Sequence, residues 1–261
     1  MTTLAIVDTC VQPARWNVAV TAALAEFRRA DRIPDTLRFH RYPRSVLLGL
    51  SQEAAGAVDA IRCRERDVEV ARRVTGGGAV YMDGGALAWD LVADWRRYAR
   101  TPADAGRRLA EIVTRVLGTL GIAAEFAPPG DIRIGDRKVC GLSGFIDGRI
   151  AVQQASLLMS VRPADMRAVL SSSADGRSPA LRVTALDRHC RSRPIVDGLR
   201  SALVHAMRDV WRVSVEATAL DDGVARRAEQ MHADEIGTDA FVWGDYAAAR
   251  GEVRTAQVCA A

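Results

Sequence analysis

The sequence predicts an α+β fold in which mixed or antiparallel sheets are flanked by helices. Helical and extended patterns follow one another without the regular strand–helix repeat of a doubly wound parallel sheet. The 261 residues are 49% hydrophobic and 26% charged, which is typical of a folded domain and excludes wholesale disorder. Segment 124–159 contains two tight-turn signals, Gly135-Asp136 and Asp147-Gly148, which indicate antiparallel hairpins.

The first part of the chain predicts a helix over 14–29 and two strands at 37–42 and 45–50, bent at Pro43. A helical stretch near 53–65 precedes a strand over 67–73, a glycine-rich segment over 75–85 and a strand over 86–95. The clearest helix follows Thr101-Pro102 and ends at Gly121. Its apolar positions predict a face that packs in the core, namely Leu109, Ile112, Val113, Val116, Leu117 and Leu120.

The C-terminal part predicts helices over about 194–235. Apolar residues recur at helical spacing from Ile195 to Trp211, and a second helix is expected near 223–234. We expect residues 1–250 to form one domain and residues 251–261 to form a loosely held tail.

Charge and cysteine usage narrow the function classes. The 36 basic and 32 acidic residues give a net charge of +4, too small an excess to favour a nucleic-acid partner. The five cysteines form no C-x-x-C pair, which argues against a disulfide framework and a zinc site. No secretion signal and no run of about 18 apolar residues is present. The sequence therefore predicts a cytoplasmic protein without a membrane partner.

Lysine occurs once in the chain, at Lys138, and all other basic residues among the 36 are arginine. On a solvated surface either cation serves, so a coding bias can replace lysine by arginine there. A compact ammonium cannot be replaced where it must lie among phosphate oxygens or against a reacting carbonyl. The count therefore marks Lys138 as a candidate functional residue.

Three consecutive glycines, Gly76–Gly78, follow a predicted strand and two arginines. Glycine lets backbone N–H groups approach an anion, and arginine side chains hold phosphate or carboxylate. The spacing matches neither the P-loop pattern nor G-x-G-x-x-G, so both of those nucleotide folds are disfavoured. A bare glycine run is equally typical of a hairpin turn, and both interpretations stay open at this point.

The solitary lysine lies in a second candidate segment, residues 130–141. Alternation along two strands joined at Gly135-Asp136 places Asp131, Arg133 and Lys138 within reach of one another. An ordinary charged hairpin has the same pattern, but the lysine count favours a functional site.

Together these segments resemble the lipoate–protein ligases, in the wider family of biotin and lipoyl ligases and octanoyltransferases. The family signature R-R-x-[ST]-G-G-G-A-V-x-H-D-x-G-N is similar to residues 72–86, and the motif N-D-I-x-x-x-G-x-K-[IV]-x-G is matched by Asp131, Ile132, Lys138, Val139 and Gly141. An upstream pattern at 37–52, Asn17-x-Ala19, Val183–Leu186 and Trp243-Gly244 extend the similarity to about residues 14–245.

The resemblance implies a biotin/lipoyl-ligase-like catalytic domain. Such a domain activates lipoate, or a related medium-chain acid, with ATP to acyl-AMP and transfers the acyl group to a lysine of a lipoyl-domain acceptor protein (GcvH-like or E2 domain). Lys138 would be catalytic, and the implied binding residues are Arg72, Thr75, Gly76, Gly77, Gly78, Ala79, Asp83, Asp131 and Gln154. Mg²⁺ would accompany ATP, with Asp131 as a candidate ligand. No C-terminal accessory domain is expected, which implies a separate accessory subunit or none.

Departures from the family pattern define two alternatives. The histidine and asparagine of the first motif are Met82 and Ala86, and the family's H-G before the last core strand is Gln154-Ala155. These changes motivate a non-catalytic, degenerate ligase that binds a lipoylated partner or lipoyl-adenylate.

An octanoyl or lipoyl transferase is the further alternative, since family transferases use a cysteine nucleophile instead of ATP. The two segments that carry this cysteine in the family correspond to 125–129 and 171–176, and neither contains one here. Cys140 and Cys190 are weaker candidates. A biotin ligase is disfavoured, because the glycine loop of that branch is G-R-G-R-x-G rather than TGGGAV.

Overall fold

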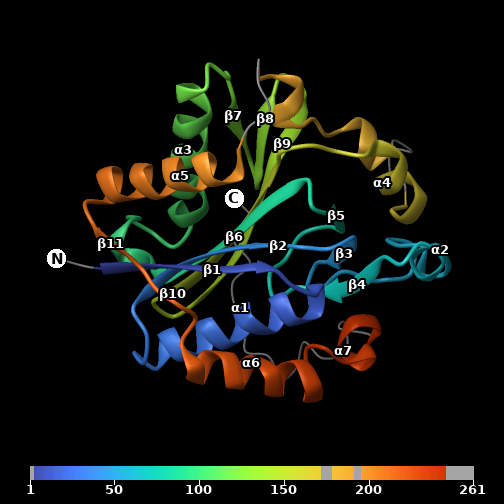
Figure 1. The fold of residues 1–261 in the computed structure, drawn as a ribbon, viewed down its shortest axis with the longest axis horizontal. Helices are drawn as coiled ribbons and strands as arrows, with labels where there is room; N and C mark the ends of the chain where they lie inside the picture. Colours follow the sequence, from blue (N-terminus) through green and yellow to red (C-terminus); the bar gives the residue numbers. More distant parts are fainter. Residues whose placement is uncertain (1–2, 172–177, 191–194, 245–261) are drawn as a thin grey trace.

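The computed structural model describes residues 3–171, 178–190 and 195–244. Its framework is a large mixed sheet of order β11-β1-β2-β6-β10-β9-β8-β7, with a small sheet of order β4-β3-β5 beside it (Figure 1). The strands of the large sheet are β1 (Thr3–Val11), β2 (Asp35–Arg41), β6 (Ala86–Asp94), β7 (Glu125–Ala127), β8 (Asp131–Ile134), β9 (Arg137–Asp147), β10 (Ile150–Leu158) and β11 (Ser214–Ala217). The β1 strand pairs in parallel with β2 and β11, and the other neighbours are antiparallel.

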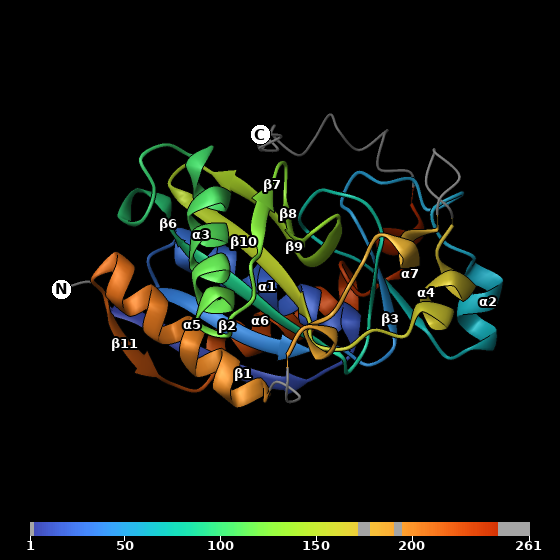
Figure 2. The ribbon, with the colours of Figure 1, turned by 90° about the horizontal axis from the view of Figure 1, so that it is seen from above.

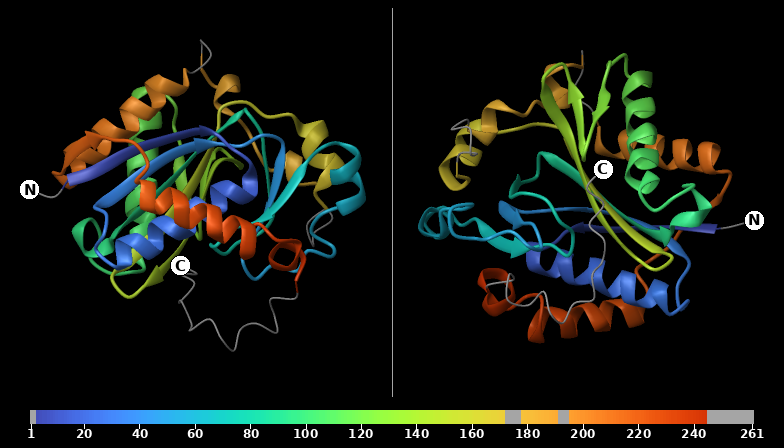
Figure 3. Two further views of the ribbon diagram at one scale, coloured as in Figure 1. Left: turned by 60° about the horizontal axis from the view of Figure 1, so that its bottom comes forward. Right: turned by 180° about the vertical axis from the view of Figure 1, so that it is seen from behind.

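Helices cover both faces of the large sheet. Helices α1 (Ala14–Arg29) and α6 (Asp222–Asp234) lie side by side on one face, and α3 (Asp104–Thr119) and α5 (Val196–Trp211) cover the other (Figures 1 and 3). Alternation along β6 serves both layers: Trp89 and Leu91 pack with α3 and α5, whereas Ala88 and Val92 pack with α1. A strand buried on both faces explains why 86–94 is almost continuously apolar.

The small sheet forms a separate layer at one end of the molecule (Figure 2). Its strands are β3 (Ser45–Leu48), β4 (Glu69–Arg72) and β5 (Val80–Met82). Around it lie α2 (Ala60–Glu65), α4 (Pro163–Val169) and α7 (Asp239–Trp243), and single 3₁₀ turns occur at Trp95–Arg97, Pro179–Leu181 and Leu186–Arg188. The glycine-rich segment connects β4 to β5, so the position of the small sheet sets where this segment lies.

The α+β prediction is confirmed, as are the helix over 14–29 and the hairpins at Gly135-Asp136 and Asp147-Gly148. Three details differ. The strands near 37–42 and 45–50 enter different sheets, and the region near 53–65 is helical only from Ala60, where the Asp59 side chain caps α2. Leu120 is 45% exposed, because α3 ends one residue before it.

Strands β1 and β11 were not predicted, and β11 interrupts the expected helical C-terminal part. The expected tail over 251–261 lies outside the described residues. No helix in the described ranges is both long and apolar enough to cross a membrane.

Candidate active site

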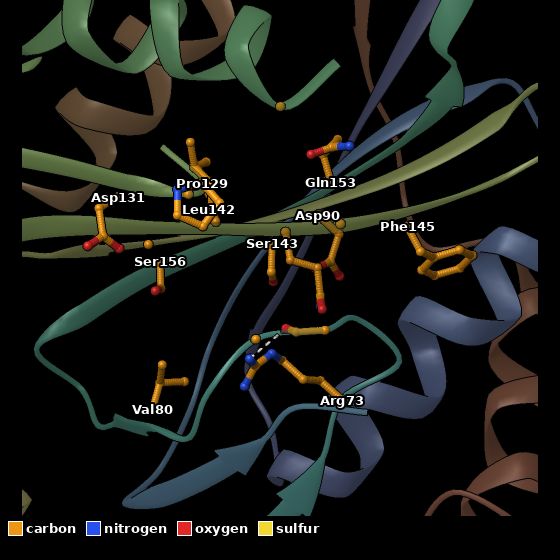
Figure 4. A pocket seen from close by; sticks show the side chains of 18 of the residues that line it. Arg73, Val80, Asp90, Pro129, Asp131, Leu142, Ser143, Phe145, Gln153 and Ser156 are labelled. Atoms are coloured by element: carbon orange, nitrogen blue, oxygen red, sulfur yellow. Dashed lines mark hydrogen bonds between the residues drawn. The ribbon is translucent and has the colours of Figure 1, made fainter. Parts of the chain in front are cut away.

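Two cavities meet beside the glycine segment. The first, of about 650 Å³, lies between the large sheet and the β4–β5 connection, and the second, of about 820 Å³, extends toward residues 52–57 and Arg182. In Figure 4, Asp90, Ser143 and Ser156 point from the strands toward the segment that carries Arg73 and Val80. The residues that line both cavities are Gly78, Val80, Met82, Asp131, Lys138, Gly141 and Ser156. Lys138 therefore lies where the two spaces join.

The β8–β9 hairpin positions Lys138. Arg133 pairs with Lys138 in the register of the hairpin, and Asp131 pairs with Gly141. The Lys138 ammonium Nζ lies 2.8 Å from Asp131 Oδ1, and an Arg133 Nη lies 3.0 Å from Asp131 Oδ2. The expectation that these three charged residues lie within reach of one another is confirmed.

The Asp131 carboxyl group is favoured in its charged form beside Lys138. Burial would raise the pKa of the Asp131 carboxyl, but the charges and hydrogen bonds of Lys138 and Arg133 outweigh burial and lower it. The Lys138 side chain remains 29% exposed toward the cavities. The site thus presents one fixed ammonium that an incoming anion can reach.

The main chain of Lys138 is held by a segment distant in sequence. The Lys138 N–H donates to the Arg182 carbonyl at 2.9 Å, and the Thr184 N–H donates to the Lys138 carbonyl at 2.8 Å. Thr184 is itself buried and its hydroxyl lies 2.8 Å from His189 Nε2. The segment 183–186, noticed in the sequence only as a resemblance, therefore anchors the β9 strand at its lysine.

The glycine segment is a supported loop rather than a free turn. Gly77 has a φ of +97°, a conformation that side-chain-bearing residues rarely adopt. The Arg73 guanidinium donates to the carbonyls of Gly76 and Gly78 at 2.8 and 2.9 Å, and burial lowers its pKa to about 10. A Cβ at Gly49 would lie 1.8 Å from the Gly77 carbonyl oxygen, so Gly49 supports the loop from a second side.

Arg72 and Asp83 lie away from both cavities, contrary to the expectation that they hold substrate. Arg72 is 1% exposed and donates to the carbonyls of Gly49, Gln52 and Val242, so its guanidinium braces the chain. Successive strand residues point in opposite directions, and Arg73 is the one that lies under the loop. The Asp83 carboxylate accepts from the Gly85 N–H at 2.7 Å and stabilises the turn before β6.

The other predicted residues lie at the cavities or directly beneath them. Gly76, Gly77 and Gln154 line the first cavity, Ala79 lines the second and Gly78 lines both. Thr75 is fully buried below the loop and donates to Gln154 Oε1 at 2.6 Å. Of the positions that depart from the family pattern, Met82 lines both cavities and Ala86 is buried and lines neither.

A buried polar row continues from Thr75 and Gln154 into the sheet, and sequence reasoning missed its further members. Gln154 donates to Asp90 Oδ1 at 2.9 Å, and Asp90 forms a fully buried ion pair with Arg38 at 2.9 Å. Thr21 of α1 donates to Asp90 at 2.8 Å. Burial raises the pKa of Asp90, but the neighbouring charges and hydrogen bonds outweigh burial and lower it. The available signal was the single carboxylate within the apolar strand 86–93.

The described thiols lie away from the two cavities, whereas one carboxylate lies at both. No cysteine among the described residues lines either cavity. Cys259 is not among the residues that the structure describes. Cys140 is fully buried, which raises its pKa to about 12, and burial also raises the pKa of Cys190. Segment 171–176 corresponds to the second segment that carries a cysteine nucleophile in family transferases, and the structure describes only its first residue, Ser171. The described ranges contain no group of three metal-ligating side chains, and Asp131 lines both cavities.

Comparison with known proteins identifies the family of this chain. Residues 13–208, most of the chain, match the family model of the lipoyl protein ligase A/B catalytic domain. The chain belongs to this family. It is 24% identical to "Octanoyltransferase LipM" of Moorella thermoacetica over 90% of the chain and 96% of that protein. A ligase family model and an octanoyltransferase thus both match this chain.

Solved structures of lipoate–protein ligases share the fold. A bi-partite lipoate protein ligase from Thermoplasma acidophilum, studied with its E2 lipoyl domain, superposes with a TM-score of 0.83 at 22% identity and covers 94% of this chain and 98% of its own. A lipoate-protein ligase A bound with ATP superposes with a TM-score of 0.80 at 24% identity and covers 94% and 99%. The α+β architecture is thus that of lipoate–protein ligases.

Proposed function

We propose that the protein is an ATP-dependent lipoate–protein ligase. The observation that carries this proposal is the placement of the Lys138 ammonium at the junction of two cavities, neither of which is lined by a described thiol. Two joined spaces suit two substrates that must react with each other, and one cation between them can stabilise charge on both. This arrangement suits acyl-adenylate formation, which needs no protein nucleophile.

The lining of the cavities favours the acid in the first and the nucleotide in the second. Leu47, Ala88, Leu142 and Phe145 line the first cavity and suit an apolar acyl chain. The second contains Arg133 and Arg182 among polar residues and suits phosphate and nucleoside groups. Related structures were solved with ATP in one case and with lipoic acid in another, which supports this pair of substrates.

The proposed reaction has two transfers. A carboxylate oxygen of the acid attacks the α-phosphorus of ATP, pyrophosphate leaves, and acyl-AMP forms. The acceptor lysine amine then attacks the acyl carbonyl, AMP leaves with the bonding electrons, and the nitrogen releases its extra proton to solvent. Lys138 stabilises the charge on phosphate oxygens in the first transfer and on the carbonyl oxygen in the second, while the loop held by Arg73 orients the substrate.

Mg²⁺ is the expected companion of the nucleotide. A single carboxylate at both cavities fits this ion, which is held by one or two carboxylates together with substrate phosphates. Asp131 is the residue that would hold it, where it would neutralise phosphate charge. Lys138 and Arg133 each pair with one oxygen of Asp131 in this structure, so the ion would take the place of one of these contacts.

Acyl transfer through a protein cysteine is the second candidate, favoured by the similarity to an octanoyltransferase. The position that corresponds to a family nucleophile is Glu125, which is exposed on β7, and the buried Cys140 thiol has a pKa raised to about 12. A thiol with a raised pKa is a poor nucleophile near neutral pH. These observations support the ligase over the transferase. The degenerate-ligase alternative is opposed by the complete Lys138–Asp131 arrangement.

Exchange of labelled pyrophosphate into ATP tests the proposal directly. We expect exchange that depends on lipoate or a related medium-chain acid, followed by acylation of a lipoyl-domain acceptor, GcvH-like or E2. Addition of candidate accessory subunits tests whether a separate subunit is needed for the first or the second transfer.

Transfer from an acyl-carrier thioester without ATP, with an acylated cysteine on this protein, would establish the transferase instead. Absence of both reactions, with tight binding of lipoyl-adenylate, would establish the degenerate ligase. We place this activity in the cytoplasm, consistent with the unpaired thiols of the described cysteines.

A further inference from the structure

The Lys138 side chain crosses the backbone of Gly141 on its path to the cavities. A Cβ built at Gly141 would lie 2.8 Å from both Cε and Nζ of Lys138. The third neighbour, Ser156 Oγ, would lie at an ordinary contact distance of 3.5 Å. The missing side chain of Gly141 is therefore the space that the end of the lysine occupies.

An irregular register brings these two residues to the same face of the sheet. Asp131 and Ile132 pair with Gly141 and Cys140, whereas Arg133 pairs with Lys138, so Val139 is an extra residue in β9. Residues three apart on a regular strand point to opposite faces, and one inserted residue reverses this parity. Val139 is fully buried in the core, which fixes the irregularity in place. Lys138 and Gly141 consequently share the face that carries Asp131.

We propose that Gly141 is a positioning residue for Lys138. Three contacts determine where the ammonium lies: backbone hydrogen bonds to Arg182 and Thr184 hold the Lys138 main chain, Asp131 attracts Nζ, and Gly141 leaves the path between them open. This inference rests on the proposed function only for its effect on catalysis. The effect on the lysine itself follows from the geometry alone.

The variant Gly141→Ala separates position from folding. Gly141 does not have a positive φ, and the atoms that an added methyl group would meet are the flexible end of Lys138. The lysine can rotate away, so the fold is retained while the ammonium leaves its site on Asp131. Gly118→Ala is the matched control, because a Cβ there would meet nothing within 4 Å and Gly118 lies on α3.

Selective ¹³C and ¹⁵N labelling of lysine makes the test unusually direct, since Lys138 is the only lysine in the chain. We expect one Cε–Nζ signal that shifts in Gly141→Ala and in Asp131→Asn, and stays unchanged in Gly118→Ala. We also expect pyrophosphate exchange to fall on the order of 10²-fold in kcat for Gly141→Ala, as for a misplacement of about 1 Å, while binding of ATP by calorimetry changes less than about twofold.

An unchanged lysine signal in Gly141→Ala would overturn the inference, and so would an altered signal with undiminished exchange. If the parent protein catalyses no exchange, the proposed function fails, but the signal still decides whether Gly141 positions the lysine. A loss of ATP binding equal to the loss of exchange would assign Gly141 to general site structure and would also overturn the inference.

Discussion

Replacement of Lys138 by arginine keeps the charge and changes its shape, which makes it the sharpest perturbation of the proposed mechanism. The ammonium lies 2.8 Å from Asp131 Oδ1, in the space above Gly141. A guanidinium is wider and planar, and pairs with both oxygens of a carboxylate. Asp131 would hold it there, with Arg133 already 3.0 Å from the other oxygen, so the charge would not reach the reacting atoms.

The expected loss for Lys138→Arg is on the order of 10²-fold or more in turnover, the scale for removal of one oxyanion donor. At 1.36 kcal/mol per tenfold, this loss corresponds to about 2.7 kcal/mol of transition-state stabilisation. Lys138→Ala should lose at least as much. Folding should be unaffected, since the pair with Asp131 is partly exposed and such pairs contribute roughly 0 to 1 kcal/mol.

Pyrophosphate exchange and thermal unfolding, measured on the same preparations, check both halves of this prediction. Near-parental turnover by Lys138→Arg would refute the role assigned to the ammonium. It would also refute the argument that a solitary lysine among arginines marks a residue that cannot be exchanged.

Four further outcomes are expected. Gly77→Val should abolish nucleotide or acyl-adenylate binding in calorimetry, because the position has a φ of +97°; undiminished affinity would reduce the glycine run to a turn. The double variant Cys140→Ala/Cys190→Ala should retain ATP-dependent acyl transfer within a few-fold, and loss of transfer with an intact fold would favour the transferase. Arg72→Ala should lower the free energy of unfolding by about 3 kcal/mol, since buried carbonyls lose their donors; an unchanged melting temperature would contradict its bracing role. The lowered pKa of Asp131 means that the carboxylate keeps its charge as the pH falls, so the Lys138 signal should stay constant from pH 8 to about 5 and change only below the usual value of 3.8. A transition near pH 6 would contradict the pairing.

Local patterns predicted those parts of the fold that are local in sequence. The hairpin that brings Asp131, Arg133 and Lys138 together follows from a tight turn between short strands, and its geometry needs no distant contact. Strand β11 pairs with β1 across more than two hundred residues, and it is short, with its first half partly buried and its second half exposed. Neither alternation nor propensity distinguishes such a strand from a loop.

The assignment of the two arginines before the glycines illustrates the limit of sequence reasoning at the site. Because successive strand residues point to opposite faces, only one of the two arginines can lie under the loop. The packing of the small sheet determines which of the two it is. Arg73 supports Gly76 and Gly78, and Arg72 braces Val242 of α7, a contact that spans 170 residues. The sequence also could not predict that Val139 is an extra residue in β9, because the irregularity is defined by the pairing of β9 with β8.

The replaced family residue at 154 is part of the support of the loop rather than a defect in it. Gln154 accepts from Thr75 at one end of its amide and donates to Asp90 at the other, a pairing that a neutral amide satisfies in one orientation. Asp90 can serve as acceptor because Arg38 compensates its buried charge. A fully buried ion pair contributes little net stability, since desolvation offsets its attraction. The ion pair instead orients the side chains around it. Arg38 and Thr21 hold Asp90, and Asp90 accepts from Gln154. Gln154 in turn accepts from Thr75 at the start of the glycine segment. The position of the glycine segment thus depends on charges in the middle of the large sheet.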